Sequence, residues 1–95
     1  MKIRASASAE RDLIDIKRYI ALQSPRAADS VIGRIGSSAR RLADSPEMGR
    51  VGAISGTREW VVRGLPYVIV YEVDWARREI VLLNVFHGAR NRPAK

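Results

Sequence analysis

Apolar residues recur at helical spacing through the first half of the chain. Over residues 6–22 they fall every three or four positions, which predicts one amphipathic helix capped by Ser6 or Ser8. Ser24 and Pro25 then give the N-cap and first-turn signals of a second helix that ends near residue 43. Two helices joined by so short a connection predict an antiparallel helical hairpin.

The second predicted helix contains an unusual number of small residues, among them Gly33 and Gly36. A glycine inside a helix costs about 1 kcal/mol relative to alanine. We therefore expect these glycines to mark a place where two elements pack closely.

The second half of the chain changes to the two-residue period of β-strands. Three runs rich in β-branched and aromatic side chains are separated by turn signals, and they cover residues 60–62, 67–73 and 80–86. Residues 1–5 alternate weakly and predict a short edge strand, whereas residues 44–56 are loop by composition. These elements predict an α+β fold, in which the helical hairpin packs on one face of a small, mainly antiparallel sheet of three to four strands.

Alternation along the strands divides their side chains between the two faces of this sheet. The bulkier set is expected under the helices: Trp60, Val62, Tyr67, Ile69, Tyr71, Val73, Ile80, Leu82 and Phe86. The opposite face is expected to have an apolar floor of Val68, Val70, Val81, Leu83 and Val85. Two helices cannot cover both faces, so this second face is expected to be open, with Glu59, Arg63, Glu72 and His87 around its rim.

Length and charge restrict the classes of function. The 95 residues predict one domain, residues 1–95. The chain carries 17 Lys and Arg against 10 Asp and Glu, a net charge of +7. Most of the cations are arginines, whose planar guanidinium suits bidentate contacts to phosphate or carboxylate. The charge favours nucleic-acid machinery or an acidic protein as partner, although a basic soluble domain without such a partner is the simpler alternative.

Composition also argues against several kinds of site. The chain has no cysteine and one histidine, His87, so neither a metal nor a cofactor is expected. No apolar run approaches the ~20 residues that cross a bilayer, and the N-terminus lacks the hydrophobic region of a signal peptide. We therefore expect a cytoplasmic protein with no membrane partner.

Candidate chemistry is concentrated on the predicted open face. Metal-free RNA cleavage by a 2′-hydroxyl needs a base, an acid for the leaving oxygen and a cation. Glu59 or His87 can supply the base or acid, and Arg63 and Arg90 the cations. Alternation predicts that Glu59, Arg63 and His87 share one face. The alternatives are a surface ion pair between Glu59 and Arg63, worth under ~1 kcal/mol, and a strand-end His87 hydrogen-bonded to the tail.

Trp75 lies in the predicted turn at residues 74–78. A tryptophan in a turn is hard to bury, so it is either an anchor for a partner or a side chain folded over the turn.

Five segments, taken in order, resemble the ParE/RelE superfamily of toxins from bacterial type II toxin-antitoxin modules, and its ParE-like, plasmid-stabilisation branch in particular. They are A-x-x-D-L-x-x-I-x-x-Y-I at residues 9–20, P-x-M-G-R at 46–50, T-R-E at 57–59, P-Y-V-I-V-Y at 66–71 and H-G-A-R at 87–90. The resemblance covers nearly the whole chain. It implies the RelE/ParE-like fold and a cognate antitoxin whose acidic, partly disordered C-terminal segment folds onto the toxin.

The superfamily divides by target. RelE-like members are ribosome-dependent endoribonucleases that cut mRNA with side chains on the open sheet face, whereas ParE-like members poison DNA gyrase and lack those residues. RelE-like ribonucleases commonly carry an arginine directly after the tyrosine of the fourth segment, where this chain has Val68. This departure favours a ParE-like toxin.

We therefore expect a toxin that inhibits DNA gyrase, is neutralised by a ParD-like antitoxin and meets operator DNA only through that antitoxin. Such a toxin needs no catalytic residue of its own. The residues expected to bind the target are Arg50, Arg63, His87, Arg90 and Arg92. Two alternatives remain open: a RelE-like ribosome-dependent mRNA endoribonuclease that uses Glu59, Arg63, His87 and Arg90, and a degenerate module that binds its antitoxin as a corepressor.

Overall fold

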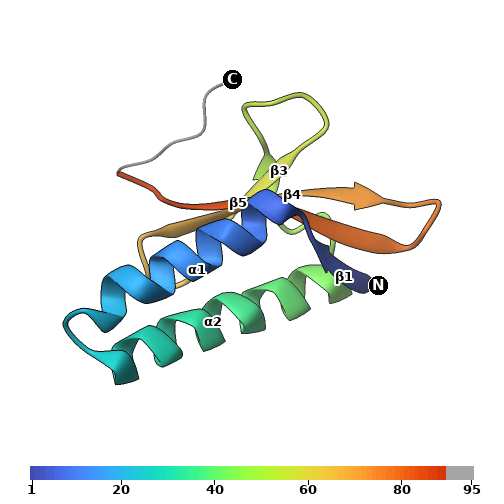
Figure 1. The fold of residues 1–95 in the computed structure, drawn as a ribbon. Helices are drawn as coiled ribbons and strands as arrows, with labels where there is room; N and C mark the ends of the chain where they lie inside the picture. Colours follow the sequence, from blue (N-terminus) through green and yellow to red (C-terminus); the bar gives the residue numbers. More distant parts are fainter. Residues whose placement is uncertain (90–95) are drawn as a thin grey trace.

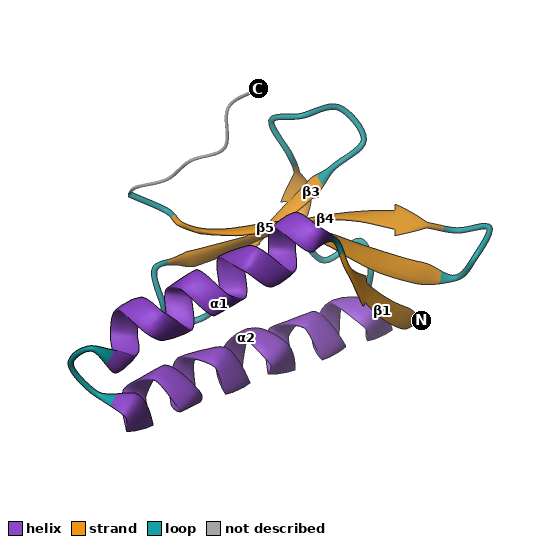
Figure 2. Cartoon of the chain, in the orientation of Figure 1, coloured by secondary structure: helices purple, strands orange, loops and turns teal. Residues whose placement is uncertain are grey.

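The computed structural model describes residues 1–89 and contains two helices and one sheet. Helices α1 (Ala7–Ala21) and α2 (Pro25–Asp44) run side by side in opposite directions on one side of the strands (Figure 1). The same view coloured by element shows the helical layer and the strand layer as separate (Figure 2). The predicted helical hairpin and the α+β class are confirmed.

The sheet has five strands, in the order β1-β5-β4-β3-β2. They are β1 (Lys2–Ala5), β2 (Arg50–Val51), β3 (Arg58–Val61), β4 (Tyr67–Asp74) and β5 (Glu79–His87). β1 pairs with β5 in parallel, and the other neighbours pair antiparallel. The prediction of three to four strands was therefore too low. β2 is only two residues long, so it has no periodic pattern and lies within the segment predicted as loop.

Serine side chains fix the starts of both helices. Ser6 Oγ accepts a hydrogen bond from Ala9 N at 3.0 Å, and Ser24 Oγ accepts one from Ala27 N at 3.1 Å. Of the two predicted caps for α1, Ser6 is the one used. Its hydroxyl also donates to Leu83 O at 3.0 Å, which ties the start of α1 to β5.

The glycines of α2 do not mark a close contact, contrary to the prediction. A Cβ built on Gly33 meets no atom within 4 Å, and one built on Gly36 meets only the flexible Arg40 side chain at 3.6 Å. Gly33 is exposed. Helix composition alone could not separate a buried small residue from an exposed one.

A β-bulge in β5 shifts the predicted faces of the sheet. Val70 pairs with Asn84 and Tyr71 with Leu82, so Leu83 has no partner in β4. An extra residue of this kind moves every later side chain of the strand to the other face.

The residues after the bulge were therefore assigned to the wrong faces. Val85 lies in the core under the helices, whereas Phe86 lies in the cluster of the opposite face. His87 pairs with Tyr67, which belongs to the helix-side core, so His87 is not on the predicted open face.

The second sheet face is not an exposed apolar surface. Val68, Val70 and Phe86 form a second small cluster with Leu83 beside it, and these three residues are 5%, 4% and 5% exposed. The predicted open floor is therefore wrong, since its central valines are buried within their own cluster. Over residues 1–89, no helix is long and apolar enough to cross a membrane.

Candidate target-binding site

Glu59 and Arg50 are directly paired residues on β3 and β2. Arg50 Nη2 lies 3.0 Å from Glu59 Oε1, and Ala53 N donates to Glu59 Oε2 at 3.2 Å. Glu59 is only 7% exposed. Both carboxylate oxygens are thus bound by donors from the β2–β3 hairpin, which makes Glu59 a structural tie across that hairpin. The ion pair foreseen between Glu59 and Arg63 is replaced by this one.

Arg63 lies just beyond the end of β3 and is exposed. Its carbonyl oxygen accepts a hydrogen bond from Arg34 Nη2 of α2, which fixes the backbone at this point. Within residues 1–89 the guanidinium of Arg63 makes no hydrogen bond or ion pair, and the exposed residue is accessible to a binding partner.

His87 ends β5 and contacts the ring of Tyr67. The two ring centroids are 5.6 Å apart, with an edge-to-face angle of 81°. The Nδ1 atom of His87 accepts a hydrogen bond from Ala89 N at 3.2 Å. These contacts match the structural alternative, in which His87 organises the end of the strand.

The structure does not bring the nuclease candidates together. Glu59 pairs with Val70 of β4, whereas His87 pairs with Tyr67. Val70 and Tyr67 lie three residues apart along β4, a distance of roughly 10 Å, and residues three apart on a strand point to opposite faces. Glu59 and His87 therefore lie on opposite faces of the sheet. No acid–base pair is assembled from Glu59 and His87. Arg90 and Arg92 lie outside the described residues.

Two side chains hold the loop at residues 46–50. The Tyr71 hydroxyl donates to Pro46 O at 2.7 Å and accepts from Gly49 N at 3.0 Å. Arg58 Nη1 donates to Gly49 O at 2.8 Å. The P-x-M-G-R and T-R-E segments therefore meet in space, and both serve the conformation of this loop.

Gly49 lets the loop approach Tyr71 closely. A Cβ at this position would lie 2.5 Å from the Tyr71 hydroxyl and 2.9 Å from Glu59 O, so no larger residue fits without movement. Burial raises the pKa of the Tyr71 hydroxyl above its ordinary 10.0, although the Gly49 hydrogen bond and the nearby Arg58 lower it in part. Tyr71 stays protonated and can donate to Pro46 over the physiological pH range.

Asp12 has a structural role that no sequence pattern indicates. Its Oδ2 atom accepts from Val85 N at 2.9 Å and from Asn84 Nδ2 at 3.3 Å. These hydrogen bonds place α1 along the edge of β5, at residues beyond those that pair with β1.

Comparison with known proteins decides the family. The family model described as the ParE toxin of the type II toxin-antitoxin system, parDE, matches residues 3–92. The chain belongs to the ParE toxin family. It is also 38% identical over 92 residues to Y4kP of Sinorhizobium fredii, a candidate toxin, with 97% of this chain and 93% of that protein covered.

Solved structures share the fold. A chain of the chromosomal ParDE system of P. aeruginosa superposes with a TM-score of 0.78 at 22% identity, covering 92% of this chain and 95% of that chain. The isolated RelE toxin of E. coli superposes with a TM-score of 0.69 at 14% identity, covering 95% of this chain and 86% of that chain. The RelE/ParE-like fold predicted from the sequence is confirmed.

Proposed function

We propose that this ParE-family toxin inhibits DNA gyrase and is neutralised by a ParD-like antitoxin. The observation that carries the proposal is the separation of Glu59 and His87 to opposite faces of the sheet, with Glu59 bound by Arg50 and Ala53. A residue set for RNA cleavage needs an acid and a base around one phosphate. A toxin that holds another enzyme's intermediate needs only a complementary surface.

The position after Tyr67 supports the same proposal. Val68 is 5% exposed and packs in an apolar cluster, so this part of the sheet offers no cation to a phosphate. The proposed target contacts are the exposed arginines and the histidine at the end of β5. They comprise Arg50, Arg63 and His87 in the described part of the chain, together with Arg90 and Arg92 beyond it.

The partners follow from the proposed system. The antitoxin supplies acidic groups to the basic toxin, and operator DNA is met only through the antitoxin. The toxin acts in the cytoplasm, where gyrase and its DNA are found.

Induction of the toxin without its antitoxin tests the proposal against its alternatives. We expect gyrase-linked DNA breaks and a DNA-damage response, with transcripts intact. Codon-position-specific cuts in ribosome-bound mRNA that vanish in Arg63→Ala or His87→Ala would establish the endoribonuclease instead. Unaffected growth from a folded chain would establish the degenerate corepressor.

A further inference from the structure

The turn between β4 and β5 presents an exposed tryptophan that the core does not use. Trp75 is 56% exposed, whereas Trp60 of β3 packs against the main core. Figure 1 shows this hairpin projecting beyond the helices, at the opposite end of the view from the α1–α2 connection. An exposed indole on a projecting element is a candidate anchor, because tryptophan is enriched at the energetic centres of protein interfaces.

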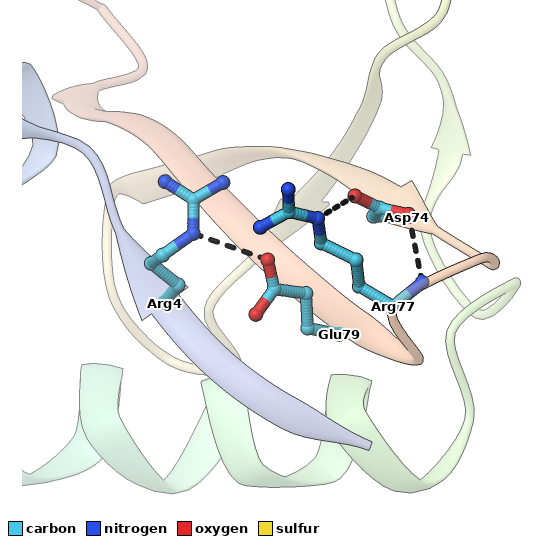
Figure 3. Close-up of polar contacts among 4 residues, drawn as sticks. All are labelled: Arg4, Asp74, Arg77 and Glu79. Carbon is cyan, nitrogen blue, oxygen red and sulfur yellow. Dashed lines mark hydrogen bonds and ion pairs between the residues drawn. The ribbon is translucent and has the colours of Figure 1, made fainter.

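The Asp74 side chain and a backbone hydrogen bond to β1 support this turn. Asp74 Oδ1 accepts from Arg77 N at 3.0 Å, and the Arg77 Nε lies 3.8 Å from Asp74 Oδ2 (Figure 3). Arg78 has a left-handed backbone with φ of 52°, and its carbonyl accepts from Lys2 N at 3.1 Å. The turn is thereby tied to β1.

A second ion pair joins the start of β5, next to the turn, to the same edge strand. Arg4 Nε of β1 lies 3.1 Å from Glu79 Oε1 of β5 (Figure 3). Both acids of the segment 74–79 are thus neutralised by arginines. The side chains of Lys2 and Arg78 form no ion pair within the described residues, and both residues are exposed.

We propose that the β4–β5 turn, with Trp75 as anchor and Arg78 beside it, inserts into an apolar pocket with carboxylates at its rim on the folded protein target of this toxin. The inference rests on the proposed function in that the toxin acts by binding a target protein. It adds a contact that lies outside the proposed arginine and histidine set.

Charge favours a protein surface over nucleic acid at this turn. Arg4 and Arg77 are paired with Glu79 and Asp74, so these two arginines offer no free positive charge to a phosphate backbone. The exposed Glu72 on the same hairpin would repel such a backbone. Surfaces that bind single-stranded nucleic acid combine a positive groove with successive aromatic side chains. This turn has one aromatic residue and a nearly balanced charge.

Shape favours a folded partner over a disordered segment. A segment that folds on binding must bury a large surface to offset its ordering cost. A narrow turn offers little area, but its backbone is bound by Asp74 and by β1 before binding. A preformed anchor loses little conformational entropy on entering a preformed pocket. The folded target therefore suits Trp75 better than the antitoxin segment does.

Binding of purified gyrase to purified toxin variants tests the inference. Trp75→Ala is expected to weaken binding about tenfold or more, with Trp75→Phe between it and the wild type. Arg78→Glu is expected to weaken binding because it reverses the charge beside the anchor. Leu22→Ala is the matched control, since Leu22 is an 84% exposed apolar residue at the α1–α2 connection. It should bind like the wild type.

Several outcomes would overturn the inference. One is gyrase binding by Trp75→Ala that equals the wild type. A second is Trp75-dependent binding to a short DNA duplex without gyrase, which would assign the turn to nucleic acid. A third is a Trp75→Ala variant that loses antitoxin binding but keeps gyrase binding, which would assign the turn to the antitoxin.

A wild-type chain that fails to bind gyrase would overturn the proposed function. The role of the turn would then be tested by comparing the growth arrest that the wild type and Trp75→Ala cause. Loss of arrest in Trp75→Ala, with helical signal and thermal melt unchanged and Leu22→Ala still toxic, would support a different folded target. Full arrest by Trp75→Ala would overturn the inference.

Discussion

The Tyr71 hydroxyl binds two backbone groups of the loop at residues 46–50, Pro46 O and Gly49 N. Tyr71→Phe removes both hydrogen bonds and leaves the buried Gly49 N–H without its acceptor. We expect the free energy of unfolding to fall by about 1–3 kcal/mol, as measured by urea denaturation. An unchanged unfolding midpoint would show that the loop does not depend on this hydroxyl.

The raised pKa of Tyr71 also predicts a pH dependence of stability. Because the folded state holds this proton more tightly than the unfolded state, the contribution is fully present below pH 10.0, the ordinary value. It is lost as the pH rises through the folded pKa. Urea denaturation from about pH 9 to about pH 11 should show a steeper loss of stability in the wild type than in Tyr71→Phe. Parallel pH profiles for the two proteins would contradict this.

Gly49 and Gly33 form a matched pair of glycines with opposite expected behaviour. Gly49→Ala places a Cβ 2.5 Å from the Tyr71 hydroxyl, and we expect the free energy of unfolding to fall by about 1–3 kcal/mol. A Cβ at Gly33 meets no atom within 4 Å, so Gly33→Ala should raise the free energy of unfolding by about 0.5–1 kcal/mol. Thermal unfolding of the two variants measures both effects. Equal melting temperatures would refute the packing argument.

At the scale of elements, Asp12 joins α1 to the edge of β5. Asp12→Ala leaves Val85 N and the Asn84 amide without this acceptor, so we expect a loss of about 1–3 kcal/mol in unfolding free energy. Asp15→Ala, an exposed acid of the same helix, should change stability by less than about 0.5 kcal/mol. Chemical denaturation of both variants checks the difference. A similar loss in both would point to a general charge effect on α1.

The elements differ in how far the sequence predicts them. Ser24 and Pro25 locate the start of α2 because caps and first-turn prolines act locally. The bulge at Leu83 depends on how β5 pairs with β4, which no local pattern specifies. One local signal of the shift was Asn84, because unbroken alternation from Ile80 and Leu82 would have placed this polar residue on the helix-side face.

The candidate site shows the same division between local and long-range information. Val68 could be recognised as a departure from the RelE-like pattern, since it rests on one position in one segment. The partner of Glu59 could not be predicted, because Arg50 belongs to a two-residue strand that composition assigned to loop. Tyr71 was correctly expected under the helices, but its hydrogen bonds reach residues about 25 positions away.

At the scale of the whole molecule, this basic chain of the ParE toxin family presents exposed cations on its helices and its edge strands, and Trp75 on a hairpin that projects beyond the helices (Figure 1). Such an arrangement suits a toxin that acts by contact. Accumulation of cleaved plasmid DNA by purified gyrase in the presence of the purified toxin tests this account most directly. We predict that cleaved DNA rises with toxin concentration and that added antitoxin abolishes the effect. Gyrase activity unchanged by a folded toxin, together with toxin-dependent cutting of ribosome-bound mRNA, would contradict the account.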